Sequence, residues 1–283
     1  MLNIPAFIRH RPLLAYFILA YVITWSLWGL MILFSWDIKS LPGNILSPLA
    51  IFGPTLAGII MTASLYGKGG LSDLATRFSF SSRQIRWFAM ALLIPFFIIV
   101  MAIVISTLMG SSIPANLGIA IWMAPLLVEF VRVLFLGGPL GEEIGWRGFA
   151  LPRLLLGNMT AMKASMVLGL IWGLWHAPFY AVAGSGQNDM IQAGGSFFML
   201  FPAFVIWVMA MTVIFTWLHK ITNGNLWIAI LFHTAINTAA FFPSVIGVQS
   251  GMVPMLNAGL TWVVAILVSR TKIFLDTSSA PKG

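Results

Sequence analysis

The chain has 283 residues, of which 60% are hydrophobic and 8% are charged, and its mean hydropathy is +0.98. This composition is more apolar than a soluble domain of the same length requires, so it predicts an integral membrane protein. The absence of cysteine excludes disulfides, thiolate nucleophiles and zinc–thiolate clusters. The net charge of +8 does not indicate nucleic-acid binding, because the basic residues lie in short clusters between apolar runs.

Eight apolar runs are long enough to cross a membrane, which takes about 20 residues of helix. The sequence therefore predicts an all-α fold: a polytopic membrane helix bundle in a single transmembrane domain, 1–283. The first run follows Arg9-His10-Arg11 and is too long for a signal peptide, so we expect it to remain as an anchor. In chain order the runs are 13–36, 45–66, 85–109, 119–136, 162–182, 197–218, 226–242 and 253–269.

The distribution of Lys and Arg predicts that both termini are cytoplasmic, and we expect the membrane to be the plasma membrane. With the N-terminus inside, the opposite face keeps only Lys39. An excess of basic residues marks the cytoplasmic loops of membrane proteins. The residues assigned to the cytoplasmic side are Arg9, Arg11, Lys68, Arg77, Arg83, Arg86, Arg147, Arg153, Lys163, Lys220, Arg270, Lys272 and Lys282.

The fourth run and the pattern that follows it, 140–155, are together too long for one span. Gly137-Gly138-Pro139 must break or kink the chain there, and we expect Pro139 to start a helix. Glu142 and Glu143 then fall in its first turns, where a helix favours anionic groups. The sequence leaves open whether this helix re-enters the bilayer or lies near its cytoplasmic face.

Glu142, Glu143 and Arg147 place charge in a chain that otherwise avoids it. Glu143 and Arg147 are four residues apart, so they share a helix face and are predicted to pair. Glu142 points about 100° away and, being unpaired, is the better candidate base. The alternative is an ion-pair cluster that only orients a loop at the membrane surface.

His176 follows a stripe of small residues, Ser165, Gly169, Gly173 and Ala177, that recurs every four positions. Such a stripe lets another helix approach closely, so we expect His176 to face protein rather than lipid. The structural alternative is a histidine that only makes a helix–helix hydrogen bond.

Two further polar pairs lie on predicted spans. His233 and Asn237 are four apart and share one helix face, a spacing that suits two groups acting on one ligand or a polar contact between helices. Glu129 and Arg132 are three apart, and we interpret them as a compensated structural pair. The sequence contains no HExxH motif, so the standard zincin signature is missing.

Taken in order, these residues resemble the CPBP family of intramembrane proteases, which includes CAAX prenyl endopeptidases and Abi-type proteins. The EExxxR motif of the family matches Glu142 to Arg147, and the HxxxN motif matches His233 and Asn237. The FxxxH motif matches at His176, with Trp172 in place of phenylalanine. The resemblance covers roughly 137–240.

The resemblance implies endopeptidase activity in an intramembrane cavity. Glu142 and His176 would activate a water molecule, and His233 and Asn237 would donate hydrogen bonds to the oxyanion. Glu143, Arg147 and Trp172 would orient the site or bind substrate. Glu142, His176 and His233 match a three-ligand catalytic zinc site, but they also suffice for metal-free general-base hydrolysis, so zinc remains an open possibility.

Two other classes of function compete with the protease. Buried Glu, Arg and His residues also serve as relays in proton-coupled transporters, although the sequence shows no convincing internal repeat. A non-catalytic immunity or chaperone protein would need no intact site, whereas here all motif positions except the phenylalanine are filled. The expected partners are the lipid bilayer and a membrane-tethered or transmembrane peptide substrate, and the sequence leaves the oligomeric state open.

Overall fold

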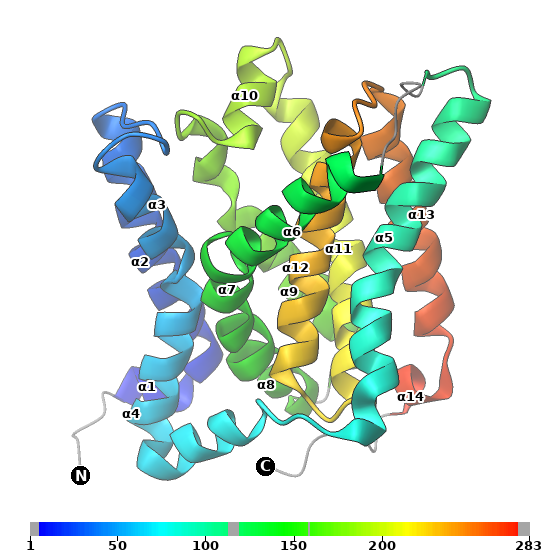
Figure 1. Ribbon diagram of the computed structural model, residues 1–283. Coiled ribbons are helices and arrows are strands. Elements are labelled where there is room, and N and C mark those ends of the chain that lie inside the picture. Colours follow the sequence, from blue (N-terminus) through cyan, green and yellow to red (C-terminus); the bar gives the residue numbers. More distant parts are fainter. Residues whose placement is uncertain (1–5, 113–118, 158, 277–283) are drawn as a thin grey trace.

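The computed structural model describes residues 6–112, 119–157 and 159–276, which form a bundle of helices (Figure 1). Within these ranges there are helices and turns but no strand. Five helices are long and apolar enough to cross a membrane, or up to eight if each of three bent helix pairs counts as one span. The predicted all-α membrane bundle is confirmed.

The helices follow the predicted apolar runs closely. In chain order they are α1 (Ala6–His10), α2 (Pro12–Leu33), α3 (Gly43–Ile51), α4 (Gly53–Thr76), η1 (Ser82–Gln84), α5 (Ile85–Leu108), α6 (Ile119–Leu136), α7 (Pro139–Gly145), the π-helical turn η2 (Trp146–Ala150), α8 (Leu151–Leu156), α9 (Ala161–Trp175), η3 (Ala177–Ala181), α10 (Gly186–Gln192), α11 (Phe197–Ile221), α12 (Leu226–Val245), α13 (Met252–Ser269) and α14 (Lys272–Leu275).

The second predicted span is two helices, α3 and α4, that meet at an angle of 46°. Pro54 explains the break, because proline has no N–H to donate to the carbonyl four residues earlier, at Ala50. Thr24 donates its hydroxyl to this carbonyl instead, over 2.7 Å. α4 also continues past the predicted end at 66, with a bend at Gly67, where φ is +62°.

The break at 137–139 is confirmed. Gly138 has φ of +120°, a conformation that favours glycine, and Pro139 occupies the first turn of α7. The segment from Pro139 to Leu156 bends by 43° from α6, and together the two are long and apolar enough to form a broken span or a re-entrant loop. The hydroxyl of Thr55 donates to the Leu140 carbonyl over 2.9 Å, which ties α7 to α4.

The stripe of small residues on α9 packs against α11, as predicted. A Cβ atom on Gly169 would lie 2.8 Å from the Cα of Met209, so the two backbones are in close contact. Ser165 donates to the hydroxyl of Thr216 over 2.7 Å. This close contact fixes α9, and with it the position of His176 at its C-terminal end.

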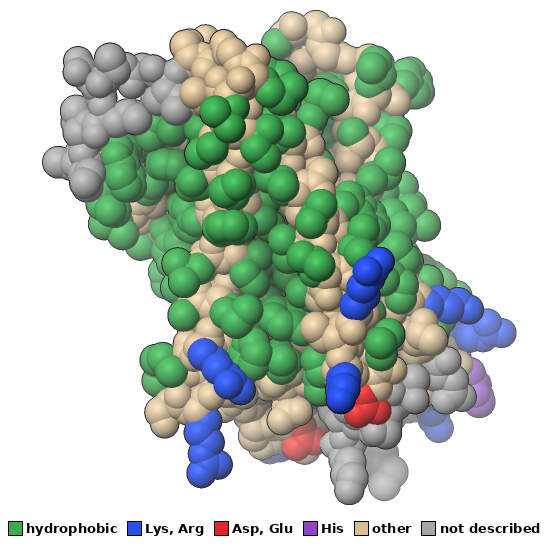
Figure 2. All heavy atoms as spheres, turned by 90° about the vertical axis from the view of Figure 1, so that its right-hand side faces the viewer, with side chains coloured by type: hydrophobic (Ala, Val, Ile, Leu, Met, Phe, Trp, Pro, Cys, Tyr) green, Lys and Arg blue, Asp and Glu red, His purple; other side chains and the backbone are tan. Residues whose placement is uncertain are grey.

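Lys and Arg side chains gather at one end of the bundle, the end where α1 and α14 lie. In Figure 2 they lie in the lower part of the face shown, and in Figure 1 α1 and α14 lie at the same end. The expectation that Arg147 belongs to this flank is wrong. Its side chain is completely buried inside the bundle, where Glu143 compensates its charge.

Candidate active site

The residues of the three sequence motifs converge on one cavity of about 430 Å³. α7 contributes Glu142, α9 and its C-terminal cap contribute Trp172 and His176, and α12 contributes His233 and Asn237. The other lining residues are Trp28, Ile51, Glu129, Gly137, Trp175, Phe179, Gly186, Gln187, Phe204, Trp207, Val208, Met211 and Ala240. The cavity therefore has a cluster of polar groups in an aromatic and aliphatic wall, as small-molecule and peptide sites commonly do.

Glu142 is held by an indole rather than left free, which corrects the sequence-based expectation. Trp172 donates its Nε1–H to Oε2 of Glu142 over 2.6 Å. A Cβ atom on Gly138 would lie 2.5 Å from Oε1, so this position has room for the carboxylate only because it is a glycine. One carboxylate oxygen is thus fixed by Trp172, and Glu142 still lines the cavity.

His176 is the C-terminal cap of α9, and a hydrogen bond defines the tautomer of its ring. Its Nδ1 lies 2.8 Å from the carbonyl oxygen of Trp172. Because a carbonyl only accepts hydrogen bonds, Nδ1 carries the proton, and in the neutral ring Nε2 keeps its lone pair. The rings of Trp175 and Phe204 contact the imidazole edge to face, with centroids 4.7 and 5.0 Å away. His176 can therefore accept a proton or a hydrogen bond through Nε2.

Glu143 joins the first and third motifs. Its Oε1 accepts from Arg147 Nη1 over 2.9 Å, which confirms the predicted pair, and from His233 Nδ1 over 2.7 Å. Arg147 lies over the rings of Trp172 and Phe215, with its guanidinium carbon 4.1 and 3.7 Å from the two centroids. Since Arg147 is fully buried and does not line the cavity, it fits the orienting alternative rather than contact with a substrate.

Asn237 completes the polar cluster one turn after His233. It donates through Nδ2 to the carbonyl of Gly137 over 3.2 Å. An amide nitrogen carries two hydrogens, so a second N–H remains available to a ligand in the cavity. The contact also fixes the side-chain amide relative to the break that precedes α7.

A metal site of the expected kind does not emerge from this geometry. Across residues 6–112, 119–157 and 159–276, no group of three His, Cys, Asp or Glu side chains is arranged to hold a metal ion. Trp172 engages only one oxygen of Glu142, and Glu143 engages Nδ1 of His233, an outer-shell contact that metal-ligating histidines also make. It is therefore the spatial grouping of the described side chains, and not these hydrogen bonds, that lacks a three-ligand zinc centre at Glu142, His176 and His233.

Glu129 also lines the cavity, although the sequence indicated only a structural role. It forms the predicted pair with Arg132, because Nε and Nη2 of Arg132 donate to its two carboxylate oxygens over 2.7 and 2.6 Å. The Arg132 side chain is 56% exposed, whereas that of Glu129 is 16% exposed. This pair therefore lies at the boundary between the cavity and the outer face of α6.

Two aromatic residues of α2 hold the end of α9, a contact that sequence reasoning missed. Phe179 donates to the carbonyl of His176 in a tight turn, which leaves the carbonyl of Trp175 available. Trp25 donates its indole N–H to that carbonyl over 2.9 Å, and Tyr21 donates to the carbonyl of Ile171. Pro178 has no N–H, so it frees the carbonyl of Leu174 and ends α9 nearby, but it does not indicate the two carbonyls that α2 contacts.

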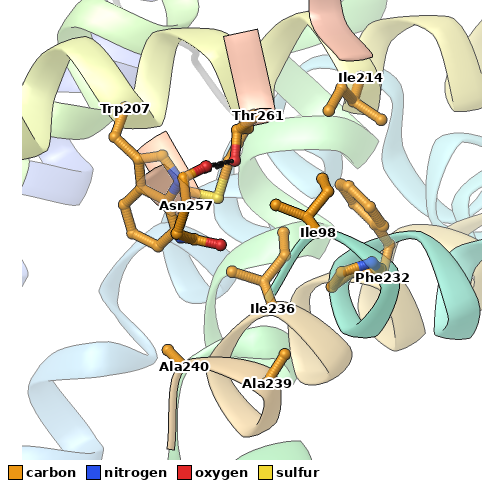
Figure 3. A pocket seen from close by; sticks show the side chains of 11 residues that line it. Ile98, Trp207, Ile214, Phe232, Ile236, Ala239, Ala240, Asn257 and Thr261 are labelled. Carbon is orange, nitrogen blue, oxygen red and sulfur yellow. Dashed lines mark hydrogen bonds between the residues drawn. The ribbon is translucent and has the colours of Figure 1, made fainter. Parts of the chain in front are cut away.

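A second, much smaller pocket of about 20 Å³ adjoins the cavity and shares Trp207, Met211 and Ala240 with it. In Figure 3 the indole of Trp207 and the side chain of Thr261 lie together at one side of this pocket. Trp207 donates to the Thr261 hydroxyl over 3.2 Å, and Thr261 donates to the Asn257 carbonyl over 2.6 Å. This volume holds about one water molecule, so it is a packing gap rather than a substrate site.

Residues 122–239 match the family described as type II CAAX prenyl endopeptidase Rce1-like. We refer to residues 122–239 as the Rce1-like region. The protein named CAAX prenyl protease 2 of Methanococcus maripaludis is 28% identical over 241 residues, which cover 81% of this chain and 83% of the relative. The Rce1-like region includes all the motif residues that line the cavity, and both similarities support the CPBP resemblance and a membrane endopeptidase.

Proposed function

We propose that the protein hydrolyses peptide bonds of membrane-associated substrates in the cavity between α7, α9 and α12. The observation that carries this proposal is that Glu142, His176, His233 and Asn237, from three helices, line one cavity. A transporter relay would need ionisable groups along a path across the bundle, whereas Glu142, His176 and His233 gather around one cavity.

Glu142 and His176 activate the water. The carboxylate of Glu142 takes one proton from the water while the water oxygen bonds to the scissile carbonyl carbon, and Nε2 of His176 accepts a hydrogen bond from the remaining O–H, which stays on the oxygen. When the carbon–nitrogen bond then breaks, Glu142 returns its proton to the departing amine. Trp172 fixes one oxygen of Glu142, so the other oxygen serves as the base.

His233 and Asn237 stabilise the oxyanion. Asn237 contributes its second amide N–H. His233 already donates through Nδ1 to Glu143, so its Nε2 becomes a donor only when the ring carries both protons. Glu143, itself paired with Arg147, holds the His233 ring in place through this hydrogen bond, which assigns Glu143 and Arg147 the role of positioning residues.

The substrate class is a membrane-tethered or transmembrane polypeptide. The name of the Methanococcus relative points to prenylated peptides as one member of this class. The cavity wall agrees with an apolar segment beside the scissile bond, since Trp28, Phe179, Phe204 and Trp207 line it.

The test is cleavage of a membrane-tethered reporter peptide by the purified protein in liposomes. Glu142→Ala and His176→Ala should each reduce the rate by about 10²- to 10⁴-fold, the usual contribution of a general base. Both variants should keep the size-exclusion profile of the folded protein. Full activity in either variant would refute the assignment of that residue.

The same assay addresses the metal. Because the described ligands do not form a three-ligand site, we expect a chelator to leave the cleavage rate unchanged. Loss of activity that zinc restores would contradict the metal-free scheme.

A further inference from the structure

The cavity lies in the half of the bundle that is farther from α1 and α14. His176 directly follows α9, whose 15 residues rise about 22 Å from Ala161 at the end where α1 and α14 lie. Asn237 lies about 16 Å along α12 from its start at Leu226, at the same end. The site is therefore displaced toward the opposite end of the molecule.

The cavity reaches the surface at that opposite end. Gly186, which is exposed, and Gln187, which is half-buried, both line it and both belong to α10. In Figure 1, α10 lies at the end of the bundle opposite α1 and α14. On the other side of the site, the completely buried side chains of Trp146, Arg147 and Phe149 fill the interior.

The basic residues gather at the end of the bundle that is opposite the opening of the cavity. Among the described residues, the helix ends on the side of α1 and α14 carry nearly all the basic groups outside the bundle interior, and the face drawn in Figure 2 shows them in its lower part. They are Arg9, Arg11, Lys68, Arg77, Arg83, Arg86, Arg153, Lys163, Lys220, Arg270 and Lys272. At the other end, the loop after α2 carries Asp37 and Lys39, and α10 carries Asp189. An excess of Lys and Arg in short loops marks the cytoplasmic side.

We propose that the site is entered from the non-cytoplasmic side, so that its substrates are membrane-anchored polypeptides whose scissile bond lies on that side of the membrane. That polypeptides entering from this side are also cleaved rests on the proposed function. A prenylated C-terminus in the cytoplasm would meet the charged, closed end of the bundle and not the opening beside α10.

Because the chain has no cysteine, single-cysteine variants can locate the opening directly. Gln187→Cys, at the rim of the cavity, should react with a membrane-impermeant maleimide in intact bacterial spheroplasts that produce the protein. The matched control is Ser82→Cys, an exposed position between the charged helix ends, which should react only after permeabilisation. Reaction of Gln187→Cys only after permeabilisation would overturn the proposal.

The second readout maps new protein N-termini in cells that produce the wild type or Glu142→Gln. Cleavages that depend on Glu142 should fall in non-cytoplasmic segments of membrane-anchored proteins, and sites in cytoplasmic segments would overturn the proposal. If no cleavage depends on Glu142, the proposed function fails, whereas the maleimide result still decides the side of access.

Discussion

Arg132 and Arg147 each pair with a glutamate one helical turn earlier, but the Arg147 side chain is buried and the Arg132 side chain is exposed. Arg147 and Glu143 have side chains that are 1% and 0% exposed, whereas Arg132 is 56% exposed. A buried carboxylate that loses its partner becomes an uncompensated charge away from water. Glu129, the partner of Arg132, lines a cavity large enough for water, so it can be solvated without its arginine.

Arg147→Ala should therefore lower the free energy of unfolding by about 3–5 kcal/mol, the cost of breaking a buried ion pair. It should also abolish reporter cleavage, because Glu143 then loses the cation that holds it beside His233. The measurement is unfolding of the detergent-solubilised protein together with the cleavage rate. The matched control is Arg132→Ala, which should cost much less; equal losses in the two variants would contradict this account.

The indole of Trp172 has a role that its position in the sequence did not indicate. At the FxxxH position the sequence indicated only an aromatic wall. The structure adds a hydrogen bond to Glu142, which a phenylalanine could not make. The residue type therefore changes how the carboxylate is held as well as how the cavity is lined.

At the scale of elements, α7 depends on close backbone contact with the broken span α3–α4. A Cβ atom on Gly141 would lie 2.8 Å from the carbonyl oxygen of Ile51, and one on Gly145 would lie 2.2 Å from that of Pro54. These two glycines are four residues apart and flank Glu142 and Glu143. Their spacing places one glycine face against α3–α4 while Glu142 faces the cavity.

Gly145→Ala should displace α7, since the added methyl group collides with backbone that cannot move aside. We expect a loss of about 1–3 kcal/mol in stability, the usual cost of overpacking, and a marked loss of cleavage because Glu142 moves with the helix. Thermal unfolding and the cleavage rate measure the two effects.

The control is Gly259→Ala, at a glycine of α13 where a Cβ atom would meet nothing within 4 Å. Alanine in a helix interior is favoured over glycine by roughly 0.5–1 kcal/mol, so this variant should be as stable as the wild type or slightly more stable. A Gly145→Ala protein with unchanged stability and activity would show that the close contact is not needed.

The elements could be predicted where the information is local. Hydropathy and helix-breaking residues are read over a few neighbouring positions, so the eight runs and the break at Gly138 and Pro139 were predicted from the sequence. The Glu143–Arg147 pair followed from a spacing of four. The contacts of Glu143 with His233 and of Trp172 with Glu142 span 90 and 30 residues, and they depend on how the helices pack, which periodicity does not specify.

At the scale of the whole molecule, the site depends on helices outside the Rce1-like region. That region begins at residue 122, yet α2 supplies the two side chains that hold the end of α9. The sequence assigned only general topology to the first four spans, because nothing in α2 indicates which carbonyls it meets. The N-terminal half thus fixes the backbone from which His176 projects.

Trp25→Phe tests this dependence, because it removes the hydrogen bond to the carbonyl of Trp175 and keeps an aromatic ring on α2. A hydrogen bond of this kind is worth about 0.5–1.5 kcal/mol, so kcat for the reporter peptide should fall by roughly 2- to 10-fold. KM should stay unchanged, since Trp25 does not line the cavity and acts only through the position of His176. The control is Trp217→Phe, which removes a buried indole whose N–H has no hydrogen-bond partner among the described residues. If both variants lower kcat equally, lost packing volume and not the hydrogen bond to α9 explains the effect.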